Sequence, residues 1–273
     1  MYELASKGIK DRSVVRVGGT SFGDGGFVTI AGPCAVEDRV QIESTARFVA
    51  GCGAQLLRGG AYKPRTSPYA FQGLGDRGVE LMQKASTISG LPAVVEALAE
   101  SDLDVLKSRV AMIQIGARNM QNFALLRAAA RTGLPILLKR SASATLDEVL
   151  YAAEYVLLEG NSDVVLCERG VRGFDPQTRN LFDLAGALRL KELTHLPVIA
   201  DPSHATGRAS LIEPVVAAAA AAGLDGAIVE VHPKPATALS DGPQALDFVG
   251  FERLMDRLEA LGFAPKVALA AGR

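Results

Sequence analysis

The sequence predicts a single α/β domain, a (β/α)₈ TIM barrel, and three observations carry that prediction. The chain has 273 residues, and one such barrel commonly needs about 250. Eight short, unbroken apolar runs alternate with longer amphipathic segments, as expected of parallel strands that helices cover on both sides. No Gly-x-Gly-x-x-Gly motif follows the first run, which favours a closed barrel over an open dinucleotide-binding sheet.

The expected elements begin with a short hairpin that precedes the barrel. Val14–Val17 and Gly25–Thr29, separated by Gly18 and Gly19, predict an N-terminal β-hairpin within residues 1–27 that closes the bottom of the barrel. The eight barrel strands are then expected at Val28–Cys34, Gln55–Arg58, Ala93–Glu96, Met112–Gly116, Ile136–Lys139, Val164–Glu168, Val198–Asp201 and Ala227–Val231.

Amphipathic segments between the strands predict the helices. The sequences Gly90-Leu-Pro92 and Gly133-Leu-Pro135 are typical helix endings before a strand. No Ser- or Pro-rich linker divides the chain, so one domain is expected over residues 1–273, with residues 264–273 as a loose tail. Clear helical patterns include Val40–Ala50, Val79–Ser89, Gln121–Arg131 and Leu146–Leu158.

The composition excludes several classes of protein. The formal net charge is −1, with 48% hydrophobic and 22% charged residues, so neither nucleic acid nor an anionic membrane is an expected partner. An odd number of cysteines, three, argues against a disulfide framework. The first residues lack the apolar core of a signal peptide, and no apolar stretch reaches bilayer length. A soluble, cytoplasmic protein is therefore expected.

Some of the side chains that follow the barrel strands suit a metal ion. The active site of this fold forms at the carboxyl ends of its strands, so these residues are expected to meet. Taken singly, Cys34 is typical of a small buried hydrophobe and His204 of a loop residue. Together with two carboxylates they suit one divalent ion, Mn²⁺, Fe²⁺, Co²⁺ or Zn²⁺, without deciding between them. The predicted metal ligands are Cys34, His204, Glu230 and Asp241.

The other strand ends carry mostly positive charge. In a chain of net charge −1, cations gathered at one mouth predict an anionic ligand, and more than one phosphate would account for so many. The loop Lys63–Pro68 adds two hydroxyls on a proline-stiffened backbone, which suits a phosphate clamp, although alone it would be an ordinary polar loop. The expected cations are Arg58, Lys63, Arg65, Arg118, Lys139, Arg140 and Arg169, with Glu96 as an acidic member of the same ring.

The remaining histidines and cysteines are expected to have supporting roles. His195 precedes a strand, at the end opposite the mouth, and Cys52 lies at a helix end. Strand alternation is expected to turn Cys167 away from the lumen, which favours packing over ligation. His232 follows Glu230 by two residues and is expected to face the same side, where it would support a metal ligand from behind.

Seven ordered motifs match those of one known enzyme family. They are Ala31–Val36, Arg58–Tyr69, Gln114–Asn122, Leu138–Arg140, Cys167–Gly170, Asp201–Gly207 and Ser240–Gln244. On these motifs the chain resembles 3-deoxy-D-arabino-heptulosonate 7-phosphate (DAHP) synthase, in the short microbial form related to the octulosonate phosphate synthases. The likeness extends over nearly all of the sequence from Val14 to Leu261.

The resemblance implies a transferase and a set of ligand roles. Its reaction would condense phosphoenolpyruvate with erythrose 4-phosphate to give DAHP and phosphate, the first step of the shikimate pathway toward chorismate and the aromatic amino acids. The four metal ligands proposed above fall on the family's metal motif. By the same transfer, phosphoenolpyruvate would be bound by Arg58, Lys63, Ala117, Arg118, Lys139 and Arg169, and the aldose by Lys63, Pro64, Arg65 and Thr66.

The resemblance also implies a chemical course. The metal would orient and polarise the aldehyde oxygen, and the methylene carbon of phosphoenolpyruvate would attack the aldehyde carbon. Water would then add to the resulting cationic centre, and phosphate would leave. Lys139 is expected to pass a proton and Glu96 to position or deprotonate the water. The expected catalytic residues are thus Lys139, Lys63, Glu96 and His204.

Partners and regulation follow from the same likeness. The chain has no room for the ACT-like or chorismate mutase domain that many relatives carry, so no regulatory domain and no built-in feedback inhibition are expected. A chorismate mutase that binds in trans is compatible with this organisation, and relatives suggest a homo-oligomer, either a dimer or a tetramer. Val95, Ser141-Ala142 and Gly173 depart from the family pattern without removing a predicted ligand.

Three alternatives stay open on the sequence. A sister enzyme of the octulosonate 8-phosphate synthase type would use arabinose 5-phosphate, although the segment Lys63–Ser67 differs from that enzyme's Asn-Arg-Thr-Ser type of clamp. A Schiff-base aldolase would use Lys139 as its nucleophile. A catalytically silent barrel would keep the side chains without turnover.

Overall fold

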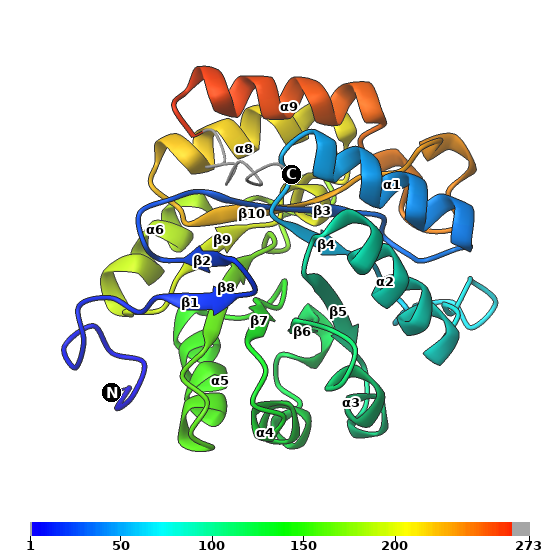
Figure 1. Ribbon diagram of the computed structural model, residues 1–273. Coiled ribbons are helices and arrows are strands. Elements are labelled where there is room, and N and C mark those ends of the chain that lie inside the picture. Colours follow the sequence, from blue (N-terminus) through cyan, green and yellow to red (C-terminus); the bar gives the residue numbers. More distant parts are fainter. Residues whose placement is uncertain (1, 264–273) are drawn as a thin grey trace, which may run out of the picture.

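The computed structural model describes residues 2–263 and contains a closed barrel of eight parallel strands with helices around it (Figure 1). Neighbouring strands follow the order β10-β3-β4-β5-β6-β7-β8-β9. Every predicted run forms one of these strands, so the predicted (β/α)₈ barrel is confirmed. The strands are β3 Val28–Gly32, β4 Leu56–Arg58, β5 Ala93–Ala97, β6 Met112–Ile115, β7 Ile136–Lys139, β8 Val164–Glu168, β9 Val198–Ala200 and β10 Gly226–Glu230.

The helices begin and end where local sequence signals require it. The α5 helix begins with a capping box, in which the Thr145 and Glu148 side chains bind each other's backbone N–H groups. Gly90 ends α2 in the left-handed conformation, with φ 74°, which glycine adopts without steric cost. The α-helices are α1 Arg39–Gly51, α2 Asp76–Ser89, α3 Glu100–Leu106, α4 Phe123–Arg131, α5 Leu146–Leu158, α6 Leu184–Leu193, α7 Pro202–Thr206, α8 Ile212–Ala221 and α9 Phe248–Ala260.

Alternation along the strands creates two apolar cores. Outward-facing strand residues pack against the helices and form the larger core. Inward-facing residues from all eight strands fill the barrel, which is therefore a packed core and not a pore. This inner core includes Ile30, Leu56, Val94, Met112, Leu137, Val165, Ile199 and Ile228.

A two-stranded hairpin closes the lower end of the barrel, where the strands begin. It consists of β1 Val15–Val17 and β2 Thr20–Phe22, paired antiparallel, and its apolar side chains join the inner core. The predicted hairpin is confirmed, but its second strand was wrongly placed at Gly25–Thr29. Val17 pairs directly with Thr20, so Gly18 and Gly19 form a two-residue turn and the second strand follows at once.

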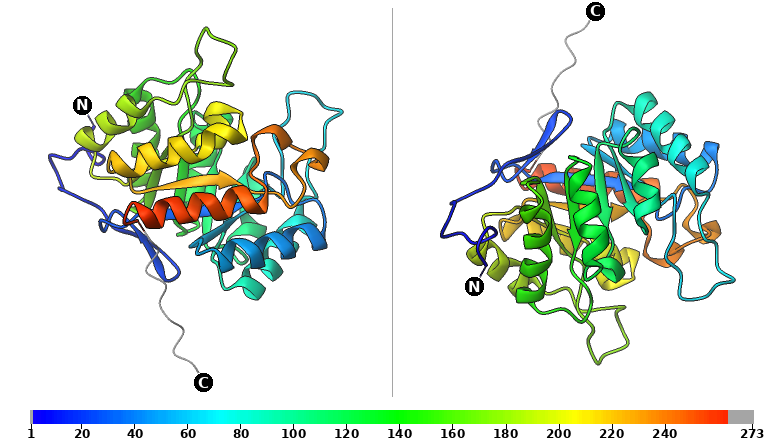
Figure 2. Two further views of the ribbon diagram at one scale, coloured as in Figure 1. Left: turned by 90° about the horizontal axis from the view of Figure 1, so that it is seen from above. Right: turned by 90° about the horizontal axis from the view of Figure 1, so that it is seen from below.

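The upper end of the barrel carries its longest loops. Figure 2 shows the loop between β4 and α2 and the loop between β8 and α6 extending from the body of the barrel. Within residues 2–263 no helix has the length and apolar character needed to cross a membrane. The predicted tail lies outside the described residues, and the single-domain organisation, the lack of a regulatory domain and the cytoplasmic location stay predictions.

Candidate active site

The carboxyl ends of the strands open into a cavity of about 680 Å³. This is the end at which enzymes of this fold carry their active sites. The β4–α2 and β8–α6 loops form much of its wall. All predicted substrate-binding residues line it, and so do most of the other predicted site residues: Arg58, Lys63, Pro64, Arg65, Thr66, Glu96, Ala117, Arg118, Lys139, Arg169, His204 and Asp241.

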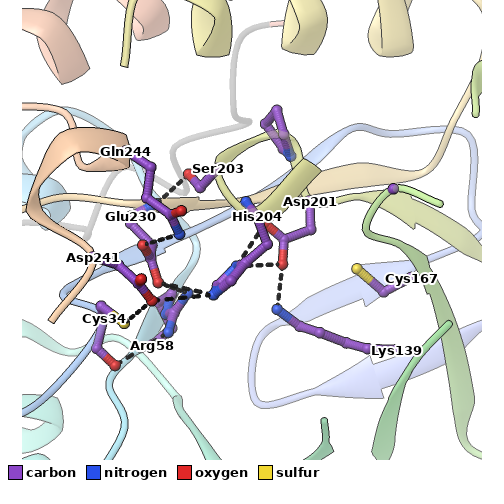
Figure 3. Close-up of polar contacts among 12 residues, drawn as sticks. Cys34, Arg58, Lys139, Cys167, Asp201, Ser203, His204, Glu230, Asp241 and Gln244 are labelled. Atoms are coloured by element: carbon purple, nitrogen blue, oxygen red, sulfur yellow. Dashed lines mark hydrogen bonds and ion pairs between the residues drawn. The ribbon is translucent and has the colours of Figure 1, made fainter. Parts of the chain in front are cut away.

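The four predicted metal ligands meet at the edge of this cavity (Figure 3). One donor atom from each lies within 4.8 Å of the others. Cys34 follows β3, His204 lies on α7 after β9, Glu230 ends β10, and Asp241 lies in the loop before α9. The fold therefore places a sulfur, a nitrogen and two carboxylate groups from four segments around one point, and this cluster could hold a metal ion.

The contacts within the cluster aim the donor atoms at one another. The Cys34 thiol donates to Asp241 Oδ2 at 3.1 Å. His204 Nε2 lies 3.3 Å from Glu230 Oε1 and 4.0 Å from Asp241 Oδ2. The two carboxylates thus face the same imidazole nitrogen, and the space that the three groups share suits a cation.

Burial and charge set the protonation of the ligands. Burial raises the pKa of the Cys34 thiol to about 12, and Glu230 adds to the rise. Burial also lowers the pKa of His204, although Asp201 and Glu230 oppose it, and this favours the neutral imidazole. For Asp241 burial alone would raise the pKa, but His204 and the Cys34 hydrogen bond bring it down to about 2. Three ligands are ready for a cation, while Cys34 must lose its proton.

Asp201, which the sequence analysis did not single out, fixes the orientation of His204. Its carboxylate oxygens lie 2.8 and 3.1 Å from His204 Nδ1, which leaves Nε2 directed at the cluster. The same carboxylate accepts a hydrogen bond from Lys139. A carboxylate behind a ligating histidine is the usual way to fix the ring. Asp201 lies at the end of a predicted strand and three residues before His204, and that position was the available signal.

Two buried cations, one at the end of β4 and one in the loop after it, donate hydrogen bonds to the cluster. Arg58 Nη1 donates to Glu230 Oε1 at 3.0 Å, and Lys63 Nζ donates to the Cys34 sulfur at 3.0 Å. Arg58 Nε is buried and has no hydrogen-bond partner within residues 2–263. An unpaired buried donor on a cation is costly unless a ligand completes it, so Arg58 is suited to receive an anion.

Further cations surround the cavity. Arg65, Arg118, Lys139 and Arg169 line it as predicted. Burial lowers the pKa of Arg169, Asp201 opposes the effect, and the nearby Arg118 and Arg179 lower it further. Cations that disfavour one another in this way are stabilised by a bound anion. The β8–α6 loop adds Arg172 and Arg179, which the sequence analysis missed because the loop has no periodic pattern.

Glu96 is the acidic side chain of the β5 strand that faces the cavity. Gln114 Nε2 donates to its Oε2 at 3.1 Å and so orients the carboxylate. The approach is close, because a Cβ on Gly116 would lie 1.8 Å from Glu96 Oε1. Glycine at position 116 is therefore what allows Glu96 to occupy this place.

Arg140 does not belong to the ring of cations, contrary to the prediction. It follows Lys139, the last residue of β7, and its N–H still donates to Cys167 O at 3.0 Å, so the alternation of faces continues through Arg140. Its Nη1 donates to Glu168 Oε2 at 2.8 Å and to Asp183 Oδ2 at 2.9 Å, and its Nε donates to Ala144 O. Arg140 is therefore part of the outer wall of the barrel.

Two further expectations about single residues were wrong. Cys167 faces the lumen and joins the inner core, although its predicted packing role holds. His232 does not support Glu230, because the strand ends there and the alternation stops; its Nε2 lies 3.3 Å from Glu37 Oε2. The structural interpretation of His195 fits its bonds to Ser13 Oγ and Leu4 O at the lower end.

Known proteins resemble this chain over nearly its whole length. The sequence model of the DAHP synthetase I family matches residues 10–262. A phospho-2-dehydro-3-deoxyheptonate aldolase of Thermotoga maritima is 46% identical over 264 residues, which are 96% of this chain and 78% of that enzyme. A 2-dehydro-3-deoxyphosphooctonate aldolase of Acidithiobacillus ferrooxidans is 29% identical over 259 residues, 88% of this chain and 91% of that protein.

Solved structures give the same result. The crystal structure of the Thermotoga maritima DAHP synthase superposes with a TM-score of 0.93 at 46% identity, covering 96% of this chain and 77% of that one. A truncated form of the 3-deoxy-D-arabino-heptulosonate 7-phosphate synthase from Thermotoga maritima has a TM-score of 0.89 at 42% identity, with 96% of both chains covered. The extra length of the first structure therefore lies outside the shared barrel.

Proposed function

This chain belongs to the DAHP synthetase I family, and on that premise we propose how its own residues carry out the family's reaction. The enzyme condenses phosphoenolpyruvate with erythrose 4-phosphate and yields DAHP and phosphate, the first step of the shikimate pathway. Use of arabinose 5-phosphate is not favoured, because the octulosonate-type relative is 29% identical and the heptonate-type relative 46%. A Schiff-base mechanism is not favoured either.

The convergence of Cys34, His204, Glu230 and Asp241 carries the proposal. Their donor atoms lie within 4.8 Å of one another beside the cation-lined cavity. A mixed set of sulfur, nitrogen and oxygen donors fits one divalent transition metal, and Mn²⁺, Fe²⁺, Co²⁺ and Zn²⁺ all satisfy it. When bound, such an ion would supply Lewis acidity toward the aldehyde oxygen.

The cations divide between the two substrates. Arg58, Lys63 and Arg169, with Arg118, Lys139 and the backbone at Ala117, would bind the carboxylate and phosphate of phosphoenolpyruvate. Lys63 is shared, because its loop continues into Pro64, Arg65 and Thr66, which would hold the aldose and its phosphate. Arginine's planar fork favours this two-point recognition of phosphate and carboxylate.

The remaining residues would move protons. As the methylene carbon of phosphoenolpyruvate bonds to the aldehyde carbon, the Lys139 ammonium, held by Asp201, would donate a proton toward the new alkoxide. Glu96, oriented by Gln114, would accept a proton from the water that adds to the cationic carbon. The tetrahedral carbon then expels phosphate. The carbon–oxygen bond to water therefore forms, and the carbon–oxygen bond to phosphate breaks, inside the cavity.

Phosphate release from phosphoenolpyruvate tests the function directly. We would compare erythrose 4-phosphate with arabinose 5-phosphate, before and after chelation, and then add back each of the four metals. Release that needs erythrose 4-phosphate, stops with chelator and returns with metal is the expected result. Release with arabinose 5-phosphate alone would contradict the substrate. Release that ignores the chelator would contradict the metal, and release with neither sugar would favour a silent barrel.

Two finer proposals concern partners. The family resemblance supports a homo-oligomer, a dimer or a tetramer, and regulation by a chorismate mutase that binds in trans. Sedimentation of the purified protein alone tests the first proposal, and a single monomer boundary would contradict it. Inhibition assays with and without added chorismate mutase test the second.

A further inference from the structure

One short segment of the β8–α6 loop contacts two of the four proposed metal ligands and reaches a third through the side chain of Gln244. It consists of Arg179 and Asn180, and neither residue has a part in the proposed chemistry. The Arg179 side chain is about one third exposed, at 35%, and lines the cavity. Because Arg179 reaches from the loop to the proposed metal ligands, substrate binding alone does not explain its position.

Arg179 holds the outer oxygen of Asp241. Its Nη1 lies 3.3 Å from Asp241 Oδ1, whereas Oδ2 of the same carboxylate faces Cys34 at 3.1 Å. The contact therefore leaves one oxygen free for the cluster and fixes the plane of the carboxylate. Asp241 needs such support, because it is the one non-glycine residue with positive φ, 55°, within residues 2–263, and a strained backbone persists only when its surroundings hold it.

Gln244 extends the contact to a second ligand. Arg179 Nη1 donates to Gln244 Oε1 at 2.7 Å, and Gln244 Nε2 donates to Glu230 Oε2 at 2.8 Å. Arginine has only donors and a carboxylate only acceptors, so the amide can point in one direction only. Glu230 Oε2 is thereby occupied, and Oε1 is left facing His204.

The backbone of the segment is fixed to the helix that carries the third ligand. The Arg179 N–H donates to Thr206 O at 3.0 Å and the Asn180 N–H to Ala205 O at 2.7 Å. The Asn180 side chain donates to His204 O at 3.0 Å. The guanidinium of Arg179 is thus presented to the carboxylates from a site anchored on α7.

We propose that Arg179 is a positioning residue that sets the metal affinity of the cluster, acting directly on Asp241 and through Gln244 on Glu230. The inference rests on the proposed metal function. It assigns to the β8–α6 loop a role in holding the metal site together, in addition to forming the wall of the substrate cavity.

Titration of metal-free protein with Co²⁺ tests the proposal without any measurement of turnover. The thiolate-to-cobalt absorption reports ligation by Cys34, and the visible ligand-field bands report the coordination geometry of the ion. Arg179→Ala is expected to raise the Co²⁺ dissociation constant by about 10- to 100-fold, the range for residues that orient metal ligands. Arg179→Lys should lose less, because it keeps the positive charge but not the planar guanidinium that fixes the direction of the two hydrogen bonds.

Arg172→Ala is the matched control. Arg172 lies in the same loop and lines the same cavity, but in the described part of the chain its side chain contacts none of the four ligands. Its removal takes away the same charge and should leave the Co²⁺ affinity within about twofold. A Gln244→Leu variant completes a double-mutant cycle, in which Arg179→Ala should cost less than it does in the parent protein.

Each result decides the matter. Affinity unchanged in Arg179→Ala, or an equal loss in Arg172→Ala, would overturn the positioning role and leave the metal function intact. A parent protein that gives no thiolate–cobalt band would contradict both the proposed metal function and the positioning role of Arg179. If Arg179→Ala fails to fold, Arg179→Lys decides in its place, and parent-like Co²⁺ affinity in that variant would contradict a positioning role of the guanidinium.

Discussion

Lys139 and Arg140 are consecutive in the sequence, yet they belong to two charge networks on opposite sides of the barrel wall. Lys139 points inward and pairs with Asp201 behind the metal cluster. Arg140 points outward and pairs with Glu168 and Asp183. Both cations are buried, and all three of their partners are carboxylates. The two networks therefore share the same kind of ion pair and differ in the side of the barrel wall on which it lies.

The two networks differ in how completely they are satisfied. In the outer-wall network, Glu168 accepts from Arg140 and from the Gly170 N–H, and Asp183 also caps α6 through the Gly186 N–H. At the mouth, Glu230 pairs with Arg58 and Asp241 with Arg179, but both carboxylates still face one imidazole nitrogen. Arg58 Nε has no hydrogen-bond partner within residues 2–263, and Asp241 has a strained backbone. A network in which every polar group has a partner stabilises the fold. A network that keeps unpaired or strained groups can instead be completed by a ligand.

The largest expected effect comes from removing a ligand at the mouth. Cys34→Ala should lower turnover at least about a thousand-fold, since Lewis-acid stabilisation is worth several kcal/mol and each 1.36 kcal/mol is a factor of ten. The midpoint of thermal unfolding should hardly change, because a thiol within a crowded cluster contributes little to folding. Steady-state kinetics with added metal and a thermal melt provide the two measurements.

Cys52→Ala is the control for the cysteine itself. Cys52 ends α1, away from the cavity, and its loss should leave turnover unchanged. If Cys34→Ala retained more than about a tenth of the parent activity, turnover would not depend on the sulfur ligand of the proposed metal site. The assignment of turnover to the network at the mouth would then be contradicted.

The next largest effect is expected in the outer-wall network, on stability instead of turnover. Arg140→Met leaves Glu168 buried without its cation, and breaking a buried pair in this way costs about 3–5 kcal/mol. Chemical denaturation measures the loss. Turnover per folded molecule should stay within a few-fold of the parent.

The double variant Arg140→Met/Glu168→Gln separates the ion pair from simple packing. The glutamine oxygen can still accept from the Gly170 N–H, and with no charge left to bury, most of the lost stability should return. A double variant as unstable as Arg140→Met would show that the arginine contributes through its packing and not through its charge.

The same pair of residues shows what the sequence can and cannot predict. Apolar runs identified all eight strands, and the fold then required their carboxyl ends to meet, which brought Cys34, His204 and Glu230 together correctly. The side chains' direction was less certain. Lys139 pairs in register with Cys167, so both face the lumen and the next residues, Arg140 and Glu168, both face outward.

Loop residues were harder to predict for a different reason. Asp201, Gln244 and Arg179 follow strands or lie in long loops, where no periodic pattern indicates which side chain turns toward the cluster. Their roles depend on individual side-chain hydrogen bonds, which join residues 3 positions apart for Asp201, 14 for Gln244 and 65 for Arg179. His232 was wrong for a related reason, since alternation was extended past the end of the strand.

The smallest expected effect concerns pH and the edge of the outer-wall network. Burial alone would raise the pKa of Asp183, but hydrogen bonds from Arg140 and from the Gly186 N–H bring it below its ordinary 3.8. A carboxylate whose folded-state pKa is depressed contributes stability above its unfolded pKa and loses it as the pH falls through the folded value. Asp183→Asn should therefore cost about 1 kcal/mol at pH 7, and this cost should shrink below about pH 4.

Thermal melts of parent and variant at neutral and acid pH measure this difference, with a neutral-pH shift of about 2–4 °C for each kcal/mol. Asp104→Asn is the control, because Asp104 is 84% exposed in its ion pair with Lys107 and such pairs contribute little. The asparagine at position 183 can still cap α6 through its oxygen, so the experiment isolates the charge. A penalty that stayed constant down to acid pH would mean that Asp183 acts through its shape and cap alone, and the outer-wall network would then owe its stability to Arg140 and Glu168.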